Sequence, residues 1–128
     1  MKHLIVIALG GSTGAVSRYL ASRYVQSVYG QIFPLGTLVV NAAGSFLIGF
    51  LFFLFDDIVV SRETRSFLII GFLGALTTFS SYSLETINLF KDGEIKLGIL
   101  NLLLNNIICL VMVIAGMLVS RLLIKIIK

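Results

Sequence analysis

Charged side chains are scarce in this chain: only 12% of its 128 residues are Asp, Glu, Lys or Arg, whereas 58% are hydrophobic. This composition is far more apolar than that of an ordinary globular domain and is typical of a membrane protein. The single cysteine, Cys109, excludes an intrachain disulfide. The sequence also shows no nucleophile with a neighbouring base, no metal-ligand cluster and no phosphate-binding loop, so we predict that the protein is not an enzyme.

Four long apolar stretches make up most of the chain, at residues 4–25, 34–55, 67–90 and 97–124. A bilayer core of about 30 Å needs about 20 helical residues to cross, so each stretch is long enough to span a membrane. We therefore expect residues 1–128 to form a single all-α domain of four transmembrane helices, with short polar connections at 26–33, 56–66 and 91–96. The first stretch begins like a secretory signal, but its apolar pattern continues to Val25, which favours a retained helix.

The net charge of +4 comes from basic residues near the ends of these stretches. Such residues indicate contact with lipid headgroups rather than binding of nucleic acid. Six lie on one side of the membrane and four on the other: Lys2, Arg62, Arg65, Arg121, Lys125 and Lys128 against Arg18, Arg23, Lys91 and Lys96. This small bias is compatible with insertion in both directions, and hence with an antiparallel homodimer; a single orientation with a small bias is the alternative.

Small residues lie along the first two expected helices. Gly10 and Gly14 form a GxxxG pair, and Gly44 and Gly49 flank one face of the second helix. Such residues let helices approach closely in a membrane. Because a chain of this size has little interior of its own, we expect its polar groups to find partners in another subunit, and the glycines favour oligomerisation.

The strongest functional signal is the segment from Gly71 to Glu85, which carries five Ser and Thr hydroxyls around Phe79 and Tyr82. Glycine and β-branched residues weaken a helix, so we expect a local break whose carbonyls are free to coordinate a cation. Phe79 and Tyr82 share a helical face and their ring edges carry partial positive charge, which attracts an anion, although such pairs more often serve packing. Glu85 either lies against a hydroxyl or reaches the interface, and it is also a candidate proton carrier.

Two further polar residues lie within the expected spans. Arg18 is about 14 residues beyond Leu4, roughly 21 Å along a helix axis. It either extends to the interface or faces an aqueous vestibule, where its charge concentrates anions. Asn41 shares a helical face with small residues and either clamps two helices together or contacts an ion.

The fourth stretch contains a polar ladder. Asn101, Asn105 and Cys109 recur at every fourth residue and stack on one side of a helix, whereas Asn106 is offset. A ladder of this kind either passes a dehydrated ion from donor to donor or holds helices together.

Three segments carry a resemblance to a known family: residues 11–19 (GSTGAVSRY), 36–41 (GTLVVN) and 77–85 (TTFSSYSLE). Through them the chain resembles the Fluc/CrcB fluoride channels over essentially its whole length. The resemblance implies a multi-pass protein of the inner (plasma) membrane, built as a dual-topology, antiparallel homodimer of four-helix subunits. It also implies a broken third helix in each subunit and two fluoride pores along the subunit interface.

The same resemblance implies roles for particular residues. Arg18 matches the vestibule arginine, and the backbone carbonyls of Gly74 and Thr77 match those that hold a structural sodium ion at the dimer centre. The pore residues implied in this way are Asn41, Phe79, Ser80, Tyr82, Ser83, Asn105 and Cys109.

The chain departs from the family pattern at three positions. Tyr82 replaces the usual phenylalanine and adds a hydroxyl, which either donates to the ion or bonds elsewhere. Cys109 replaces a frequent serine and donates only weakly. Val113 replaces a hydroxyl residue, so the polar track is lined differently there.

The expected function is passive, selective export of cytoplasmic fluoride. Fluoride is small and tightly hydrated, so a narrow path has to replace its water with donors and ring edges and exclude chloride by size. The alternative is a small multidrug-type, proton-coupled exporter, but such a protein needs a glutamate within its first helix, where this chain has none. A non-transporting assembly subunit would account for the glycine stripes but not for the hydroxyl-rich segment.

Overall fold

The computed structural model describes residues 1–29 and 32–127, and this part of the chain is built of helices. Their order is α1 (Lys2–Tyr29), α2 (Leu35–Asp57), α3 (Arg62–Arg65), the π-helix η1 (Ser66–Leu73), α4 (Gly74–Leu76), α5 (Phe79–Lys91) and α6 (Ile95–Ile127). Among the described residues, four helical spans are long and apolar enough to cross a membrane: Lys2–Tyr29, Leu35–Asp57, Arg62–Lys91 and Ile95–Ile127. The predicted all-α fold with four spans and a broken third helix is confirmed. Residues 30–31 of the first expected connection, and Lys128, lie outside the described residues.

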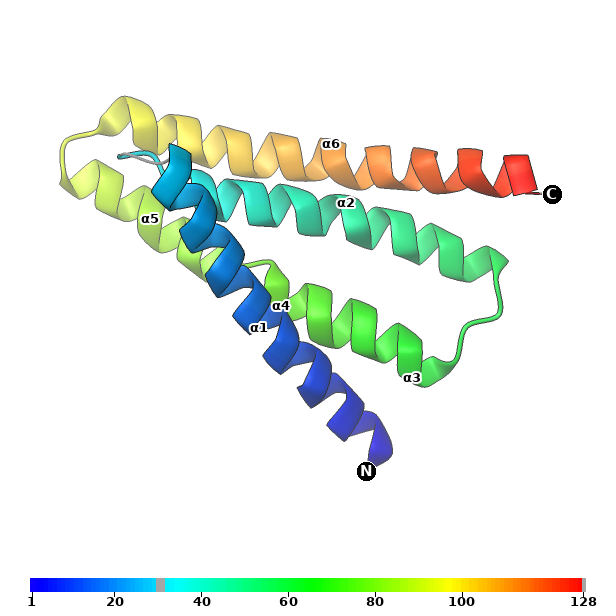
Figure 1. Ribbon diagram of the computed structural model, residues 1–128. Coiled ribbons are helices and arrows are strands. Elements are labelled where there is room, and N and C mark those ends of the chain that lie inside the picture. The colour runs from blue at the N-terminus through cyan, green and yellow to red at the C-terminus, as the bar shows by residue number, and fades with distance from the viewer. Residues whose placement is uncertain (30–31, 128) are drawn as a thin grey trace.

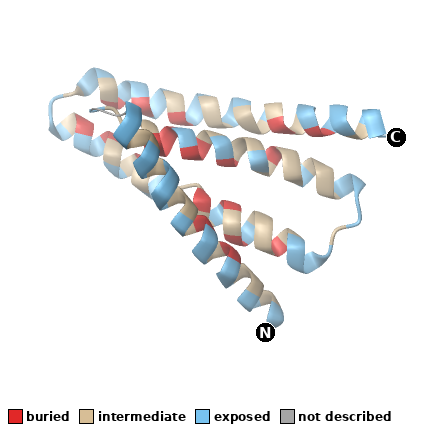
Figure 2. Ribbon diagram, in the orientation of Figure 1, coloured by how far each residue is buried: buried red, intermediate tan, exposed pale blue. Residues whose placement is uncertain are grey.

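The helices form two closely packed pairs (Figure 1). Helix α6 lies along α2, while α1 crosses obliquely over η1 and α4. Buried residues lie on the faces where helices meet, including the face of α5 toward α6, and the outward faces are exposed and apolar (Figure 2). Such a surface requires lipid or another protein around it, as expected for a membrane protein.

Glycines set the distance between α1 and the third span. A Cβ atom added to Gly14 would lie 2.2 Å from the carbonyl oxygen of Phe72, and one added to Gly10 would lie 2.4 Å from that of Phe67. The GxxxG pair therefore packs inside the chain, against η1, and does not serve the contact between subunits for which the sequence favoured it.

The α2–α6 pair relies on the same kind of contact. A Cβ on Gly49 would lie 2.2 Å from the carbonyl oxygen of Val113, and one on Gly116 would lie 2.1 Å from that of Phe46. Within each pair the two helices are thus in backbone-to-backbone contact, so they have little freedom to move relative to each other.

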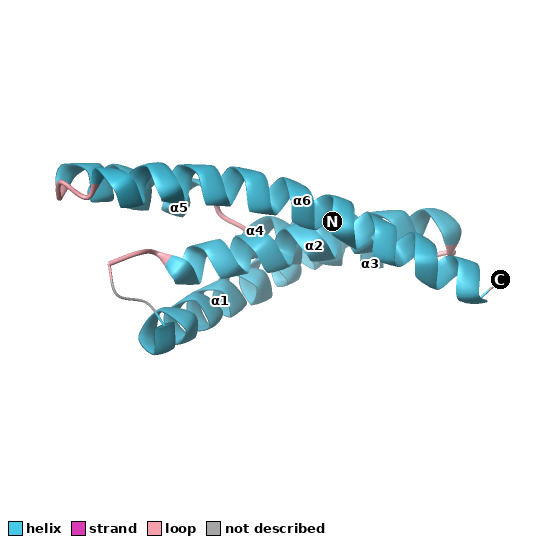
Figure 3. Cartoon of the chain, turned by 90° about the horizontal axis from the view of Figure 1, so that it is seen from above, coloured by secondary structure: helices cyan, strands magenta, loops and turns pink. Residues whose placement is uncertain are grey.

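The third span is interrupted between α4 and α5, where Figure 3 shows a short loop. Thr77 (φ −83°, ψ 150°) and Thr78 (φ −147°, ψ 115°) are extended rather than helical. Thr78 then starts α5 as its N-cap, because its Oγ1 accepts a hydrogen bond from the Ser81 N–H at 3.2 Å. The break falls at the two β-branched residues of the hydroxyl-rich segment.

Two glycine substitutions test the tight crossing of α1 and η1. We expect Gly14→Ala to lower the free energy of unfolding by about 1–3 kcal/mol, because its methyl group collides with backbone that cannot move aside. Gly11→Ala is the matched control, since nothing lies within 4 Å of its added Cβ. Thermal unfolding of both variants in one detergent, followed by far-UV circular dichroism, makes the comparison; equal melting temperatures would show that the crossing is not tight.

Candidate functional site

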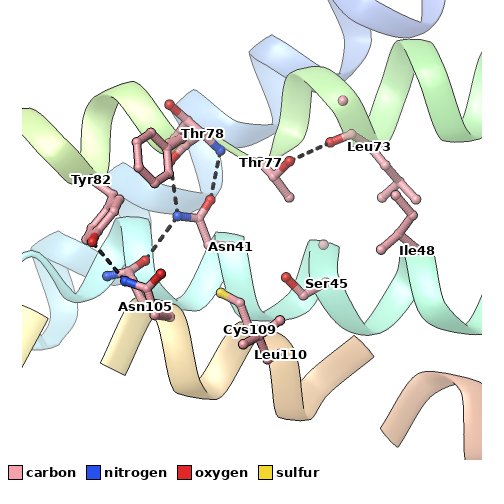
Figure 4. Close-up of a pocket in the computed structure, with 14 residues that line it drawn as sticks. Asn41, Ser45, Ile48, Leu73, Thr77, Thr78, Tyr82, Asn105, Cys109 and Leu110 are labelled. Atoms are coloured by element: carbon pink, nitrogen blue, oxygen red, sulfur yellow. Dashed lines mark hydrogen bonds between the residues drawn. The ribbon is translucent and has the colours of Figure 1, made fainter. Parts of the chain in front are cut away.

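A cavity of about 370 Å³ lies beside the break in the third span. Side chains from α2, the third span and α6 line it (Figure 4). Seven of the predicted site residues meet there: Asn41, Gly74, Thr77, Phe79, Tyr82, Asn105 and Cys109. Segments far apart in the sequence thus combine into one partly polar site.

Asn41 stabilises the break in the third span through hydrogen bonds to the backbone of Thr78. Its Oδ1 accepts the Thr78 N–H at 2.8 Å, and its Nδ2 donates to the Thr78 carbonyl oxygen at 3.1 Å. The same Nδ2 donates to Oδ1 of Asn105 at 3.1 Å (Figure 4). The Asn41 side chain is 7% exposed, so an apolar residue there would leave both backbone groups of Thr78 without this partner. Of the two roles that the sequence left open, the structure shows the clamp.

Gly74 and Thr77 are among the residues whose carbonyl groups lose their helical donors at the break. In a continuous α-helix the N–H of Thr78 would bond the Gly74 carbonyl, and that of Ser81 would bond the Thr77 carbonyl. Here the first donates to Asn41 and the second to the Thr78 hydroxyl. The Gly74 and Thr77 oxygens are therefore among the backbone acceptors that this break makes available.

Arg18 also meets the break. The half-buried side chain crosses from α1, and its Nε donates to the Ala75 carbonyl oxygen at 3.1 Å. A cation is favourable at the C-terminal end of a helix, where carbonyls lack partners. Arg18 therefore supports the end of α4, and it does not line the cavity beside the break.

Phe79 and Tyr82 form an edge-to-face pair, with ring centroids 5.2 Å apart and an interplanar angle of 70°. Tyr82 is 7% exposed, whereas Phe79 is 75% exposed and faces out of the chain. The Tyr82 hydroxyl oxygen accepts a hydrogen bond from Nδ2 of Asn106 at 2.9 Å. Asn106 thus belongs to the site, although its offset from the ladder excluded it at the level of sequence.

The ladder of α6 forms hydrogen bonds within the protein. Nδ2 of Asn105 donates to Oδ1 of Asn101 at 2.9 Å, and Nδ2 of Asn101 donates to Oγ1 of Thr86 at 2.9 Å. Thr86 in turn donates to the Tyr82 carbonyl oxygen at 2.8 Å. Asn101 therefore joins α6 to α5, and Asn105 joins α6 to α2 through Asn41; this is the second of the two roles considered for the ladder.

Besides Arg18, three of the predicted site residues lie outside this cavity. Ser80 is exposed, and the Ser83 hydroxyl donates to the Phe79 carbonyl oxygen at 2.8 Å within α5. Glu85 lines a separate cavity of about 270 Å³ together with Arg23 and Thr37. Its Oε1 accepts the Thr37 hydroxyl at 2.6 Å, while its Oε2 is buried without a hydrogen-bond partner among the described residues.

These features define a small polytopic membrane protein with a polar, partly open site at a broken helix. The family model described as CrcB-like protein, Camphor Resistance (CrcB), matches residues 5–117. The chain is 46% identical over 123 residues to the fluoride-specific ion channel FluC of Hahella chejuensis, covering 95% of this chain and 97% of that protein. It is 47% identical over 116 residues to the fluoride-specific ion channel FluC of Shewanella baltica strain OS185, covering 91% and 94%. The chain belongs to the CrcB family, and the resemblance drawn from its three segments is confirmed.

The clamp is tested by replacing Asn41 with leucine, which has a similar volume. Leaving one buried polar group unsatisfied costs about 1–3 kcal/mol, so Asn41→Leu should speed deuterium uptake in peptides that cover residues 77–81. Ser45→Ala is the control, since Ser45 lines the same cavity and makes no side-chain hydrogen bond within the described chain. Mass spectrometry of both proteins in detergent measures the exchange; unchanged uptake in Asn41→Leu would contradict the clamp.

Proposed function

We infer that this chain is a fluoride-selective ion channel that lets fluoride leave the cytoplasm passively. The observation that carries this function is identity of 46% across almost the full length of a fluoride-specific channel. The relatives are channels, which favours neither an enzyme nor the proton-coupled exporter. The first helix also lacks the glutamate that the exporter would need, because Lys2–Tyr29 contains no acidic residue.

The site supplies the chemistry that a small anion needs. The ring edges of Phe79 and Tyr82 carry partial positive charge, and they lie beside side chains that donate hydrogen bonds. We assign Asn41, Asn105 and Cys109 to the wall of the pore. We assign Ser80 and Ser83 to the part of the pore that a second subunit closes. We assign Arg18 to the vestibule through which anions reach the pore.

An antiparallel homodimer in the inner membrane completes the proposal. The exposure of Phe79, 75% in a single chain, supports it, because an anion path along this ring needs a second wall. The small difference in basic residues between the two sides of the membrane is compatible with insertion in both directions. Each dimer would then carry two equivalent pores related by its twofold axis.

We also propose a sodium ion at the dimer centre, held by the Gly74 and Thr77 carbonyl oxygens of both copies. Oxygen atoms are the ligands that hard cations prefer, and the break withdraws the helical donors from these two carbonyls. Gly74 is exposed, and the nearest atom to an added Cβ lies 3.8 Å away, so a partner can approach its backbone. Sodium bound there would supply a positive charge shared by the two subunits.

Fluoride flux from proteoliposomes tests the function and the role of Phe79. We expect vesicles loaded with potassium fluoride to release fluoride through the wild-type protein, and vesicles loaded with potassium chloride to retain chloride. Phe79→Ile removes the ring edge and should slow fluoride efflux at least about tenfold, which corresponds to about 1.4 kcal/mol in the barrier. Efflux is followed with ion-selective electrodes.

The matched control is Phe52→Ile, at a half-exposed ring of α2 outside the cavity. Normal flux through both variants would remove Phe79 from the pore. Chloride efflux as fast as fluoride efflux would contradict selectivity.

Sodium dependence tests the central ion. A ligand that binds only the folded state at about 100 times its dissociation constant adds about 2.7 kcal/mol to stability. We therefore expect sodium chloride to raise the melting temperature of the protein above that in N-methyl-D-glucamine chloride at equal ionic strength. Potassium chloride is the second control, and equal melting temperatures in all three salts would contradict a sodium site.

A further inference from the structure

Asn106 donates a hydrogen bond to the Tyr82 hydroxyl, and the pore proposed above makes no use of this contact. We propose that Asn106 orients the Tyr82 hydroxyl so that its proton points into the cavity and donates to fluoride. Asn106 is then a positioning residue, and the Tyr82 hydroxyl is an additional anion ligand beside the ring edges. This inference rests on the proposed channel function and deepens it.

The orientation of the Asn106 amide follows from its second contact. Nδ2 of Asn106 donates to the carbonyl oxygen of Leu102 at 2.7 Å as well as to the Tyr82 hydroxyl at 2.9 Å. If the amide were turned over, its Oδ1 would lie against the Leu102 carbonyl oxygen, and two acceptors would repel each other at this distance. The Leu102 carbonyl therefore fixes Nδ2 toward Tyr82, and the Tyr82 oxygen is the acceptor of that hydrogen bond.

Because the Tyr82 hydroxyl oxygen is the acceptor in the bond with Asn106, the proton of that hydroxyl remains free to donate. A tyrosine hydroxyl carries one proton, and this proton is not used in the bond with Asn106. No other hydrogen bond of Tyr82 Oη occurs in the part of the chain that the structure describes. Tyr82 is 7% exposed and lines the cavity. Its hydroxyl proton can therefore meet an acceptor inside the cavity.

The free proton favours an anion in the cavity. A donor that is buried without a partner destabilises the protein, and a hydrogen bond to a charged acceptor is stronger than one to a neutral acceptor. Oδ1 of Asn41 already accepts from Thr78, and Oδ1 of Asn105 already accepts from Asn41, whereas a fluoride ion offers a fully charged acceptor. A fluoride ion beside Tyr82 satisfies the hydroxyl without disturbing this network.

Two substitutions and their combination test the pair in proteoliposomes. Tyr82→Phe keeps the ring and removes the proton, and we expect fluoride efflux at low fluoride concentration to fall about tenfold, equivalent to about 1.4 kcal/mol. Asn106→Leu should reduce efflux in the same direction, because the hydroxyl loses its fixed orientation. In the double variant, Asn106→Leu should cause no further loss, since its effect passes through the hydroxyl that is already absent.

The controls are Tyr24→Phe and Asn88→Leu, which make the same changes at exposed positions away from the cavity. Far-UV circular dichroism and gel filtration report whether each variant folds. Because Asn106 is exposed, we expect Asn106→Leu to fold. Additive losses in the double variant would indicate a general structural effect of Asn106 and would overturn its positioning role.

A spectroscopic titration gives a second readout that does not depend on flux. The chain has no tryptophan and four tyrosines, so its near-UV absorption comes mainly from tyrosine. Fluoride, but not chloride, should perturb this absorption in the wild type and in Tyr24→Phe, and the change should vanish in Tyr82→Phe.

The results separate this inference from the proposed function. Wild-type protein that passes no fluoride would contradict the channel itself. Wild-type protein that conducts, with Tyr82→Phe and Asn106→Leu conducting equally well, would leave the channel standing and overturn the hydroxyl as a ligand.

Discussion

One amide side chain makes the interrupted third helix compatible with a membrane. Hydrocarbon supplies no water, so each backbone group freed by a break has to be satisfied by protein or by a wet cavity. Asn41 satisfies the N–H and the C=O of Thr78 together, and Arg18 meets the Ala75 carbonyl on the other side of the break. Of the residues whose carbonyls lose their helical donors, Gly74 is exposed and Thr77 is half-buried, so these two carbonyls do not lie in a packed core. The position of the site therefore follows from where the backbone has been satisfied and where it has not.

The glycine contacts explain how a single asparagine can hold this geometry. Gly49 and Gly116 bring α2 and α6 into backbone contact, which places Asn41 beside Asn105. Gly14 brings α1 against η1, which brings Arg18 to the end of α4. Hydrogen bonds of this kind contribute little individually, but they join rigid pairs and fix the register between them. Packing thus sets the distances, and the polar side chains select the one arrangement in which the break is satisfied.

Much of the fold could be predicted from the sequence, because span length and hydropathy are properties of consecutive residues. The break was also predictable, since glycines and β-branched residues at Gly71–Thr78 weaken a helix locally. The site was harder, because periodicity shows which residues share a face but not which neighbour that face meets. Asn106, one residue from Asn105 and so about 100° away around the helix, contacts Tyr82 from a face that the ladder argument did not consider. For the same reason the sequence could not show that Gly10 and Gly14 pack inside the chain, and the identity of the ion came from family resemblance alone.

Few donors remain available in the cavity, which suits a channel that has to release each ion. The amide nitrogens of Asn41 and Asn105 already donate to protein oxygens, so neither is free to hold an anion strongly in this arrangement. In the proposed pore, the contacts left for the ion are the edge of Phe79, the hydroxyls of Ser45 and Tyr82 and the thiol of Cys109. A site of strong, committed donors would bind fluoride and retain it, whereas a channel has to release each ion to the next position. In the proposed pore, the amides hold the helix break, and the anion is left with contacts that are easily exchanged.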